Sequence, residues 1–178
     1  MKELTFVSGN DVKAEQLRRH LPITILREKV DLPEIQSLDV LEVVADKAQR
    51  AYEILQRPVL VEDFSMRLKG LNDFPGPLLK WFTTSLSGAE ICEMLDGKSR
   101  AAVAQIGVAI CDESGVQTFL GEHVGKVAHR PRMTGSFMFE SLFIPYGSEQ
   151  TWSEMTTGDK VKFSVRARAY EKLKEYLE

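Results

Sequence analysis

The sequence feature that most constrains the fold is a pair of long strand-like runs, 100–112 and 116–128, joined by only Glu-Ser-Gly. Two such runs with so short a connection predict an antiparallel hairpin. Further strand-like runs, at 3–8, 23–29 and 59–61, alternate with segments whose apolar residues recur at helical spacing. With 178 residues, 43% of them hydrophobic, the chain suits one mixed α/β domain over residues 1–178, or two lobes sharing one sheet.

Helix signals support this alternation. Asn10 is placed to cap a helix after the first strand, and Ser87 with Glu90 forms a capping box. Two amphipathic helices are predicted, one over 40–55 and one over 164–177, whereas 130–158 is irregular and rich in aromatic residues. The segment Asp-Phe-Pro-Gly-Pro-Leu-Leu-Lys-Trp-Phe, 73–82, combines a turn with a short apolar helix.

Charge and composition narrow the class of protein. The 26 acidic and 23 basic residues give a formal net charge of -3, which provides no basic field of the kind that binding to polymeric nucleic acid requires. No apolar run resembles a signal peptide or a membrane span, so we expect a cytoplasmic protein with no membrane partner. Cys92 and Cys111 lie far apart, which predicts packed thiols rather than a disulfide or a zinc site.

The turn after the first strand is a candidate anion site. Ser8, Gly9 and Asn10 lie between a strand and a helix, where backbone N–H groups are exposed, and Lys13 follows one turn later. The same residues also make an ordinary capped turn, and no G-x-x-x-x-G-K-[ST] motif occurs in the chain. On its own, the turn therefore leaves both interpretations open.

A pair of carboxylates ends the third strand-like run. Glu62 and Asp63 directly follow Val-Leu-Val, and adjacent strand residues serve one ligand only where a strand ends, at the edge where α/β sites form. Three ionised carboxylates, these two and Glu34, would repel one another unless a cation such as Mg²⁺ lay among them. The alternative is that the pair merely opens a solvated loop.

Six motifs then indicate a family. They are Ser-Gly-Asn-Asp-Val-Lys, Val-Asp-Leu-Pro-Glu-Ile-Gln, Pro-Val-Leu-Val-Glu-Asp-Phe-Ser-Met, Phe-Pro-Gly-Pro-Leu-Leu-Lys-Trp-Phe, Thr-Trp-Ser-Glu-Met and the late Ser-Val-Arg-Ala-Arg-Ala. Over nearly the whole chain their order and spacing resemble the Ham1-like inosine triphosphate pyrophosphatases. The resemblance implies Mg²⁺-dependent hydrolysis of ITP, dITP or XTP to the monophosphate and pyrophosphate. It also implies an elongated two-lobed α/β fold around a long mixed sheet, an active-site cleft between the lobes, and a homodimer.

The resemblance also implies roles for individual residues. Asp63 would orient or deprotonate the attacking water, Lys13 and Lys80 would assist at the phosphates, and Glu34, Glu62 and Asp63 would form the metal site. Lys47 matches a family lysine near the acidic cluster. The substrate-binding residues would be Ser8, Gly9, Asn10, Lys13, Phe137, Phe139, Glu140, Lys160, Ser164 and Arg166.

Departures from the family pattern concentrate in the base-reading half. The family's Phe-Gly-Trp/Tyr-Asp reads Phe-Met-Phe-Glu at 137–140, and its Ser-His-Arg reads Ser-Val-Arg, with Val165 in the middle. Phe64 replaces the usual small residue after the acidic pair. Two alternatives stay open: a nucleotide-binding or regulatory protein with weakened catalysis, because fold alone does not guarantee activity, and a pyrophosphatase for another nucleobase.

Overall fold

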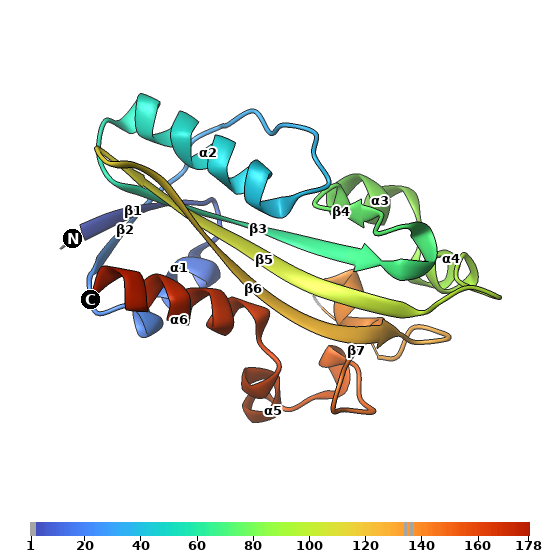
Figure 1. The fold of residues 1–178 in the computed structure, drawn as a ribbon. Coiled ribbons are helices and arrows are strands. Elements are labelled where there is room, and N and C mark those ends of the chain that lie inside the picture. The colour runs from blue at the N-terminus through green and yellow to red at the C-terminus, as the bar shows by residue number, and fades with distance from the viewer. Residues whose placement is uncertain (1–2, 134, 136) are drawn as a thin grey trace. The chain divides into compact units, whose positions relative to one another are not determined.

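The computed structural model describes residues 3–133, 135 and 137–178 of the chain. Strands and helices alternate along these residues, as the sequence predicted (Figure 1). In chain order the elements are β1 (Glu3–Val7), α1 (Asp11–His20), β2 (Thr24–Glu28), α2 (Val40–Leu55), β3 (Val59–Leu68), β4 (Pro75–Gly76), α3 (Leu79–Ser85), α4 (Gly88–Glu93), β5 (Ala101–Asp112), β6 (Gly115–Val127), β7 (Phe143–Pro145), α5 (Thr157–Lys162) and α6 (Val165–Leu177).

The strands form one open mixed sheet in the order β2-β1-β3-β5-β6-β7, with β4 paired to β3. β1 is parallel to β2 and to β3. The pairs β3–β4 and β6–β7 are antiparallel. The predicted hairpin is confirmed as the neighbouring strands β5 and β6, which are joined by a two-residue turn, Glu113 and Ser114.

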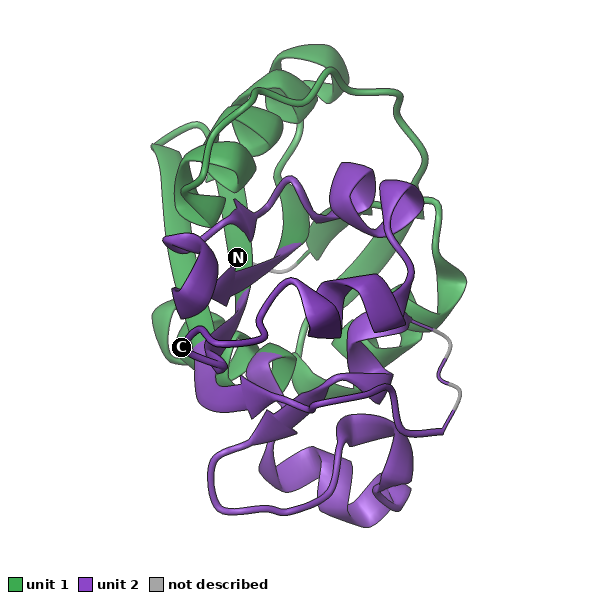
Figure 2. Ribbon diagram, turned by 90° about the vertical axis from the view of Figure 1, so that its right-hand side faces the viewer, with its two compact units in different colours: residues 1–63, 106–121, 166–178 green, residues 64–105, 122–165 purple. Residues whose placement is uncertain are grey.

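The chain divides into two compact units (Figure 2). Unit 1 comprises residues 1–63, 106–121 and 166–178, and unit 2 comprises residues 64–105 and 122–165. The long strands β3, β5 and β6 each contribute residues to both units. Because each unit is assembled from separate segments of the chain, no single cut in the sequence divides them.

Unit 1 is a layered α/β structure. Helix α2 lies on one face of its strands, and α1 and α6 lie on the other (Figure 1). The side of α2 that faces the strands carries the predicted apolar stripe. It contributes to a buried cluster that comprises Val44, Ala48, Ala51, Val59, Val61, Ala109 and Cys111. Since side chains alternate along a strand, Leu60 and Glu62 of β3 point to the opposite face, toward α1 and α6.

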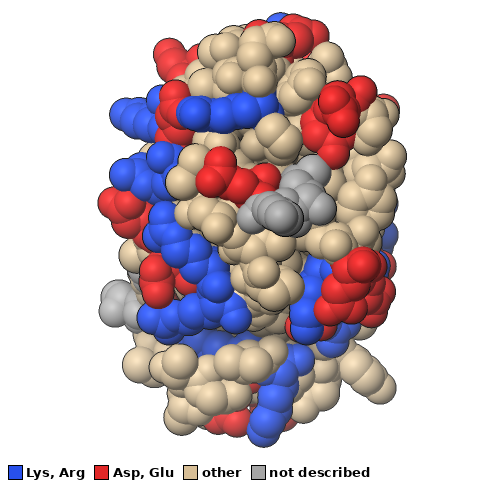
Figure 3. Space-filling model, turned by 90° about the vertical axis from the view of Figure 1, so that its left-hand side faces the viewer, with Lys and Arg blue, Asp and Glu red and all other residues tan. Residues whose placement is uncertain are grey.

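The surface of the protein mixes the two signs of charge. On the face seen in Figure 3, acidic side chains lie among the basic ones. Ion pairs within unit 1 join several of its surface arginines to nearby carboxylates; they are Arg18–Glu15, Arg19–Glu15, Arg27–Asp11 and Arg57–Glu28. Exposed pairs of this kind contribute little to stability, typically about 0–1 kcal/mol each, so the core holds the unit together.

Unit 2 has a core of its own beneath short helices and turns. The capping box predicted for Ser87 and Glu90 is confirmed at the start of α4. Cys92 and Cys111, one in each unit, are both buried and free, as expected. The fully or almost fully buried side chains of unit 2 include Met66, Leu68, Ile91, Leu95, Phe139, Leu142, Phe143 and Ile144.

Strand β3 is longer than the sequence suggested. The run 59–61 predicted a strand that ends at Glu62 and Asp63, but β3 continues to Leu68. The strand continues because β4 pairs with it at Met66 and at the next residue. Met66 and Leu68 are also buried, which stabilises this extension. Glu62 and Asp63 therefore lie inside a strand, and their side chains point to opposite faces of it.

Candidate active site

The acidic pair lies where the parallel part of the sheet ends. Phe6 of β1 is opposite Leu60 of β3, and β1 ends one residue later, at Val7. Glu62 and Asp63 are therefore the first residues of β3 beyond the carboxyl end of β1. Open α/β sheets bind ligands beyond the carboxyl ends of their parallel strands. The acidic pair lies beyond the carboxyl end of β1, but it lies inside β3 and not at the end of that strand.

The turn between β1 and α1 is capped as the sequence predicted. The Asn10 carboxamide oxygen accepts hydrogen bonds from the backbone N–H groups of Val12, at 3.0 Å, and Lys13, at 3.3 Å. The backbone N–H of Asn10 in turn donates to the Ser8 hydroxyl at 3.1 Å. This capping orders the first turn of α1 and directs the Lys13 side chain toward β3.

Glu62 is the centre of a buried cluster within unit 1. Its Oε1 atom lies 3.1 Å from Lys13 Nζ and accepts a hydrogen bond from Arg166 Nη2 at 2.9 Å. Its Oε2 atom accepts from Arg166 Nε at 3.1 Å and from the Tyr170 hydroxyl at 2.7 Å. Each carboxylate oxygen thus has two partners, which matches the four lone-pair sites of the group. The Arg166 contact is the bidentate arrangement that binds carboxylates most strongly.

These contacts fix the ionisation of the cluster. Burial raises the pKa of Glu62, but the charges of Arg166 and Lys13 and the hydrogen bonds from Arg166 and Tyr170 outweigh it, so the pKa is lowered. Burial also raises the pKa of the Tyr170 hydroxyl, and the Glu62 charge raises it further. The carboxylate is therefore charged and the phenol is protonated at neutral pH.

Arg166 keeps donors beyond those that Glu62 uses. Its Nη1 atom donates to Gln16 Oε1 at 3.3 Å, while Nε and Nη2 face Glu62. A guanidinium carries five N–H groups, and the Tyr170 hydroxyl is a further hydrogen-bonding partner of Arg166 beside these three contacts. With 26% of its side chain exposed, Arg166 is accessible to a ligand.

The other predicted metal-site carboxylates lie in a different setting. Asp63 points to the α2 face of β3, opposite Glu62, because neighbouring strand residues alternate. Glu34 accepts a hydrogen bond at 2.7 Å from Lys47 of α2, which places Lys47 beside an acidic residue as the resemblance implied. Within the described part of the chain, no group of three or more His, Cys, Asp or Glu side chains is placed to hold a metal ion. The three predicted ligands are thus not gathered into one cluster.

Unit 2 carries the residues predicted to read the base, except Arg166, which lies in unit 1. The Phe137 ring packs edge-on against Phe64, with ring centroids 5.4 Å apart, and Phe64 also contacts Trp152 at 6.4 Å. Phe139 is completely buried, so a base could stack on its ring only after neighbouring side chains move, whereas Phe137 is half-buried. Glu140 forms an ion pair with Lys160 at 3.9 Å, which brings together two of the predicted substrate-binding residues.

Two further predicted residues are accessible. Lys80 of α3 is exposed, and its ammonium lies 5.6 Å from the centroid of the neighbouring Trp81 ring. Ser164 is half-buried and directly precedes α6. Among the residues that the structure describes, no acidic side chain forms an ion pair with Lys80, so its predicted role at the phosphates stays a prediction.

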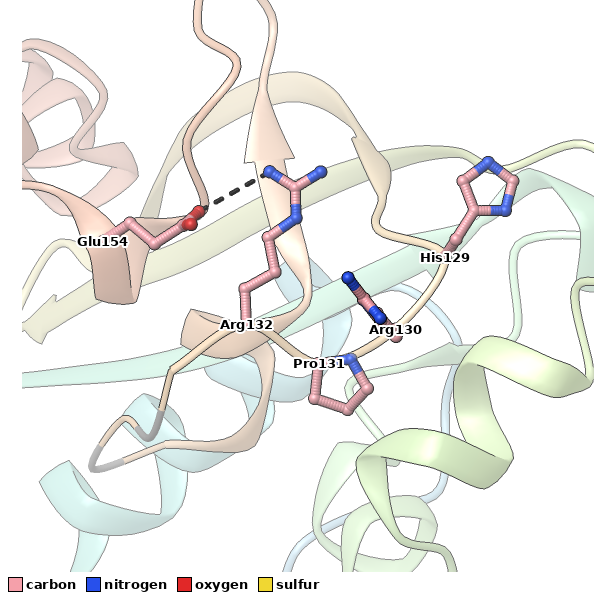
Figure 4. A pocket seen from close by; sticks show the side chains of 5 residues that line it. All are labelled: His129, Arg130, Pro131, Arg132 and Glu154. Carbon is pink, nitrogen blue, oxygen red and sulfur yellow. Dashed lines mark ion pairs between the residues drawn. The ribbon is translucent and has the colours of Figure 1, made fainter.

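A basic pocket of unit 2 lies among residues that the sequence did not single out. A cavity of about 500 Å³ is lined by His129, Arg130, Pro131, Arg132 and Glu154. Figure 4 shows the Arg132 guanidinium directed at Glu154, 3.6 Å away. Arg132 also donates to the Glu149 carbonyl at 2.8 Å. These bonds occupy Arg132 within unit 2, and none of the predicted site residues lines the cavity.

Two residues of the Glu62 cluster were missed by sequence reasoning, Tyr170 and Gln16. Tyr170 was passed over because it lies between apolar positions of the last helix. Its spacing was a usable signal, since Arg166 and Tyr170 are four residues apart and therefore share a helix face. Gln16 offered no such signal, because its contact with Arg166 spans 150 residues of sequence.

Comparison with known proteins places this geometry in a family. The model of the Ham1 family matches residues 4–176. The chain belongs to the Ham1 family. Similar proteins include the inosine triphosphate pyrophosphatase of Phaeosphaeria nodorum, 39% identical over 98% of this chain and 93% of that protein. The dITP/XTP pyrophosphatase of Methanopyrus kandleri is 32% identical over 98% of this chain and 95% of that protein.

Solved structures agree on the fold. The Ham1 protein of Staphylococcus aureus superposes with a TM-score of 0.85 and covers 99% of this chain and 98% of its own, at 19% sequence identity. A HAM1 protein from Coxiella burnetii gives the same TM-score at 22% identity, with 99% of this chain and 98% of that one covered. The expected family and the α/β fold with a mixed sheet and flanking helices are therefore confirmed.

Proposed function

We propose that this member of the Ham1 family hydrolyses non-canonical purine nucleoside triphosphates, such as ITP, dITP or XTP, to the monophosphate and pyrophosphate. Its relatives carry the names of these activities. The observation that carries the proposal is the cluster of Lys13, Glu62 and Arg166 beyond the carboxyl end of β1, where Asp63 is the next residue of β3 and points to its other face. Two cations and one buried anion leave a net positive charge that suits a triphosphate, and the Asp63 carboxylate is the proposed acceptor of a proton from water.

The proposed roles of individual residues are those that the family resemblance implies. Asp63 orients or deprotonates the water that attacks the α-phosphorus, and the bond between the α- and β-phosphates breaks. Lys13, Lys80 and Lys160 supply positive charge to the phosphates, and the Ser8–Asn10 turn adds backbone and hydroxyl groups. Developing negative charge is stabilised best by groups that are already in place, and Lys13 is held by Glu62 before any substrate arrives. The predicted base-reading residues are Phe137, Phe139, Glu140, Ser164 and Arg166.

Magnesium is the metal whose chemistry fits the carboxylates. Glu34 and Asp63 offer hard oxygen ligands, and 47% of the Glu34 side chain is exposed, so its contact with Lys47 leaves it accessible. Glu62 fits a metal poorly in this arrangement, because Arg166, Lys13 and Tyr170 occupy both of its oxygens. Glu34 and Asp63 would therefore hold the ion. When bound, Mg²⁺ offsets part of the triphosphate charge.

The proposal also covers the assembly and the cellular location of the protein. Trp81 has 67% of its surface exposed whereas its neighbour Phe82 is buried, and an exposed aromatic ring of this size suits an interface between two copies of the chain. We place the protein in the cytoplasm as a homodimer. None of the helices among the described residues has the length and apolar character needed to cross a membrane.

The test is a panel of nucleoside triphosphates assayed for pyrophosphate release. ITP, dITP and XTP are expected to yield pyrophosphate and monophosphate with Mg²⁺, and excess chelator should abolish the reaction. Inorganic phosphate as the first product would contradict the proposal. Tight nucleotide binding without turnover of any member of the panel, dTTP included, would instead favour the weakened regulatory protein.

A further inference from the structure

We propose that Tyr170 is a positioning residue that acts through Glu62 to hold Arg166 and Lys13 in place for the phosphate-bearing substrate, and that Glu62 is the anchor of these cations. This inference rests on the proposed function and deepens it. The resemblance gave Tyr170 no role, and it gave Glu62 a different role, as a metal ligand.

Exposure within the cluster rises in a consistent order. Tyr170 is completely buried, and the Glu62 side chain is only 2% exposed. Arg166 and Lys13, which contact Glu62 from α6 and α1, have side chains 26% and 35% exposed. The carboxylate therefore lies behind two cations that reach solvent. A ligand that arrives from solvent contacts the two cations before it reaches Glu62. Glu62 is therefore placed to hold the cations rather than to contact the ligand.

Tyr170 is itself held in place, so it can fix the position of the Glu62 carboxylate. Its ring packs edge-on against His20 of α1, with ring centroids 5.5 Å apart, and it follows Arg166 by one helical turn on α6. Its hydroxyl donates to Glu62 Oε2 at 2.7 Å, a distance typical of a strong bond to a charged acceptor. This bond restricts rotation of the carboxylate, and the bidentate contact then fixes the plane of the Arg166 guanidinium.

The fixed plane matters because it sets the direction in which Arg166 presents its N–H groups. A bidentate donor loses most of its advantage when its plane can turn, since two bonds of correct geometry then form only part of the time. Glu62 also screens Lys13 from Arg166, two cations that would otherwise repel each other across the same carboxylate. Loss of the Tyr170 hydroxyl should therefore weaken phosphate binding without removing any group that touches the substrate.

The matched variants are Tyr170→Phe and Tyr176→Phe. Both remove one hydroxyl from α6, but Tyr176 is 48% exposed and contacts Phe119 rather than the Glu62 cluster. Tyr170→Phe should lower kcat/KM for ITP about tenfold, mostly through a higher KM, which corresponds to about 1.4 kcal/mol. Tyr176→Phe should match wild type. If Tyr170→Phe aggregates, Tyr170→Met, whose flexible apolar chain adapts to irregular gaps, serves in the same comparison.

A double-mutant cycle separates positioning from a general loss of structure. Arg166→Lys keeps the charge but loses the planar fork, so Tyr170→Phe should have little further effect on KM in that background. Additive effects of the two substitutions would overturn the proposal. So would a Tyr170→Phe protein whose KM matches wild type.

Binding of inorganic tripolyphosphate, measured by titration calorimetry without metal, keeps this inference separate from the proposed function. Weaker tripolyphosphate binding by Tyr170→Phe than by wild type and Tyr176→Phe would support positioning. This result would stand even if no nucleotide of the panel were hydrolysed, and only the proposed function would then fail. Equal binding by all three proteins together with normal ITP hydrolysis would reject positioning alone. Wild type that binds no tripolyphosphate would reject the positioning role for this ligand.

Discussion

Two carboxylates of similar predicted importance lie in opposite environments in the two units. Glu62 of unit 1 has a 2% exposed side chain and four contacts of 2.7 to 3.1 Å. Glu140 of unit 2 has a 27% exposed side chain and an ion pair of 3.9 Å with Lys160. A buried ionised group is tolerated only when all its partners are in place, whereas a partly exposed one can change partners at little cost. The Glu62 cluster of unit 1 is therefore preorganised, whereas the Glu140–Lys160 pair of unit 2 is adaptable.

The largest expected effect tests whether the chemistry belongs to the preorganised unit. Asp63→Asn keeps the size of the side chain but removes its basicity, so kcat should fall by about 10²- to 10⁴-fold, the usual contribution of a general base. Nucleotide binding should stay near wild type because Lys13 and Arg166 remain held by Glu62. Single-turnover kinetics and equilibrium binding measure the two quantities. Lost binding with persistent single-turnover chemistry would show that Asp63 does not activate water.

The second prediction breaks one ion pair in each unit with the same kind of change. Arg166→Met leaves the buried Glu62 without its bidentate partner and should lower the free energy of unfolding by about 3–5 kcal/mol. Lys160→Met removes the partner of the more exposed Glu140 and should change it by less than about 1 kcal/mol. Denaturant unfolding at pH 7 without divalent metal compares the two variants. Similar losses in both would mean that the contrast in burial carries no energetic difference.

The dependence on pH sharpens the same contrast. The pKa of Glu62 is lowered in the folded protein, because the nearby cations and hydrogen bonds outweigh the effect of burial. A lowered pKa contributes stability that is complete above the unfolded value, near 4.5, and that is lost as the pH falls through the folded value. The gap in stability between wild type and Arg166→Met should therefore narrow below about pH 4.5. A gap that widens toward acid would contradict this account.

Sequence reasoning predicted regular elements well and side-chain partners poorly. The caps at Asn10 and Ser87, the stripe of α2 and the hairpin of β5 and β6 all depend on residues close in sequence, and all were found. The end of β3 was wrong because the strand continues through pairing with β4, a contact made by a later segment. Local patterns cannot reveal where a distant segment will pair.

The candidate site shows the same limit. The resemblance named Lys13, Glu62 and Arg166 and made Glu62 a metal ligand together with Glu34 and Asp63. The strand pattern separately predicted that the strand ends at the acidic pair. Alternation along the longer strand instead directs Glu62 and Asp63 to opposite faces. Tyr170 completes the cluster through a contact across 108 residues, which only the fold brings together. Such long-range contacts decide which carboxylate pairs with a lysine or arginine of the protein. They also decide which carboxylate stays available to a metal ion.

The smallest expected effect concerns Val165, the last residue of unit 2. Val165 stands where the family pattern has histidine, and a valine side chain neither donates nor accepts a hydrogen bond to a purine 6-oxo group. Losing one such bond removes about 1–3 kcal/mol of discrimination, or roughly tenfold to hundredfold in the ratio of kcat/KM values. The protein should therefore prefer ITP over ATP only weakly, and Val165→His should strengthen that preference.

The control for this change comes from a neighbouring helix. Val165 is only 6% exposed, so a histidine at this position is largely buried. The thermal unfolding of the Val165→His protein should therefore be compared with that of wild type. Val161→His places the same residue at a position of α5 that is 67% exposed, and its ITP to ATP ratio should match wild type. A wild-type preference for ITP above about a thousandfold, well beyond what one hydrogen bond provides, would show that the base is read elsewhere. An unchanged ratio in folded Val165→His would lead to the same conclusion, and the half-buried Phe137 ring with the Glu140–Lys160 pair would then be the groups to vary next.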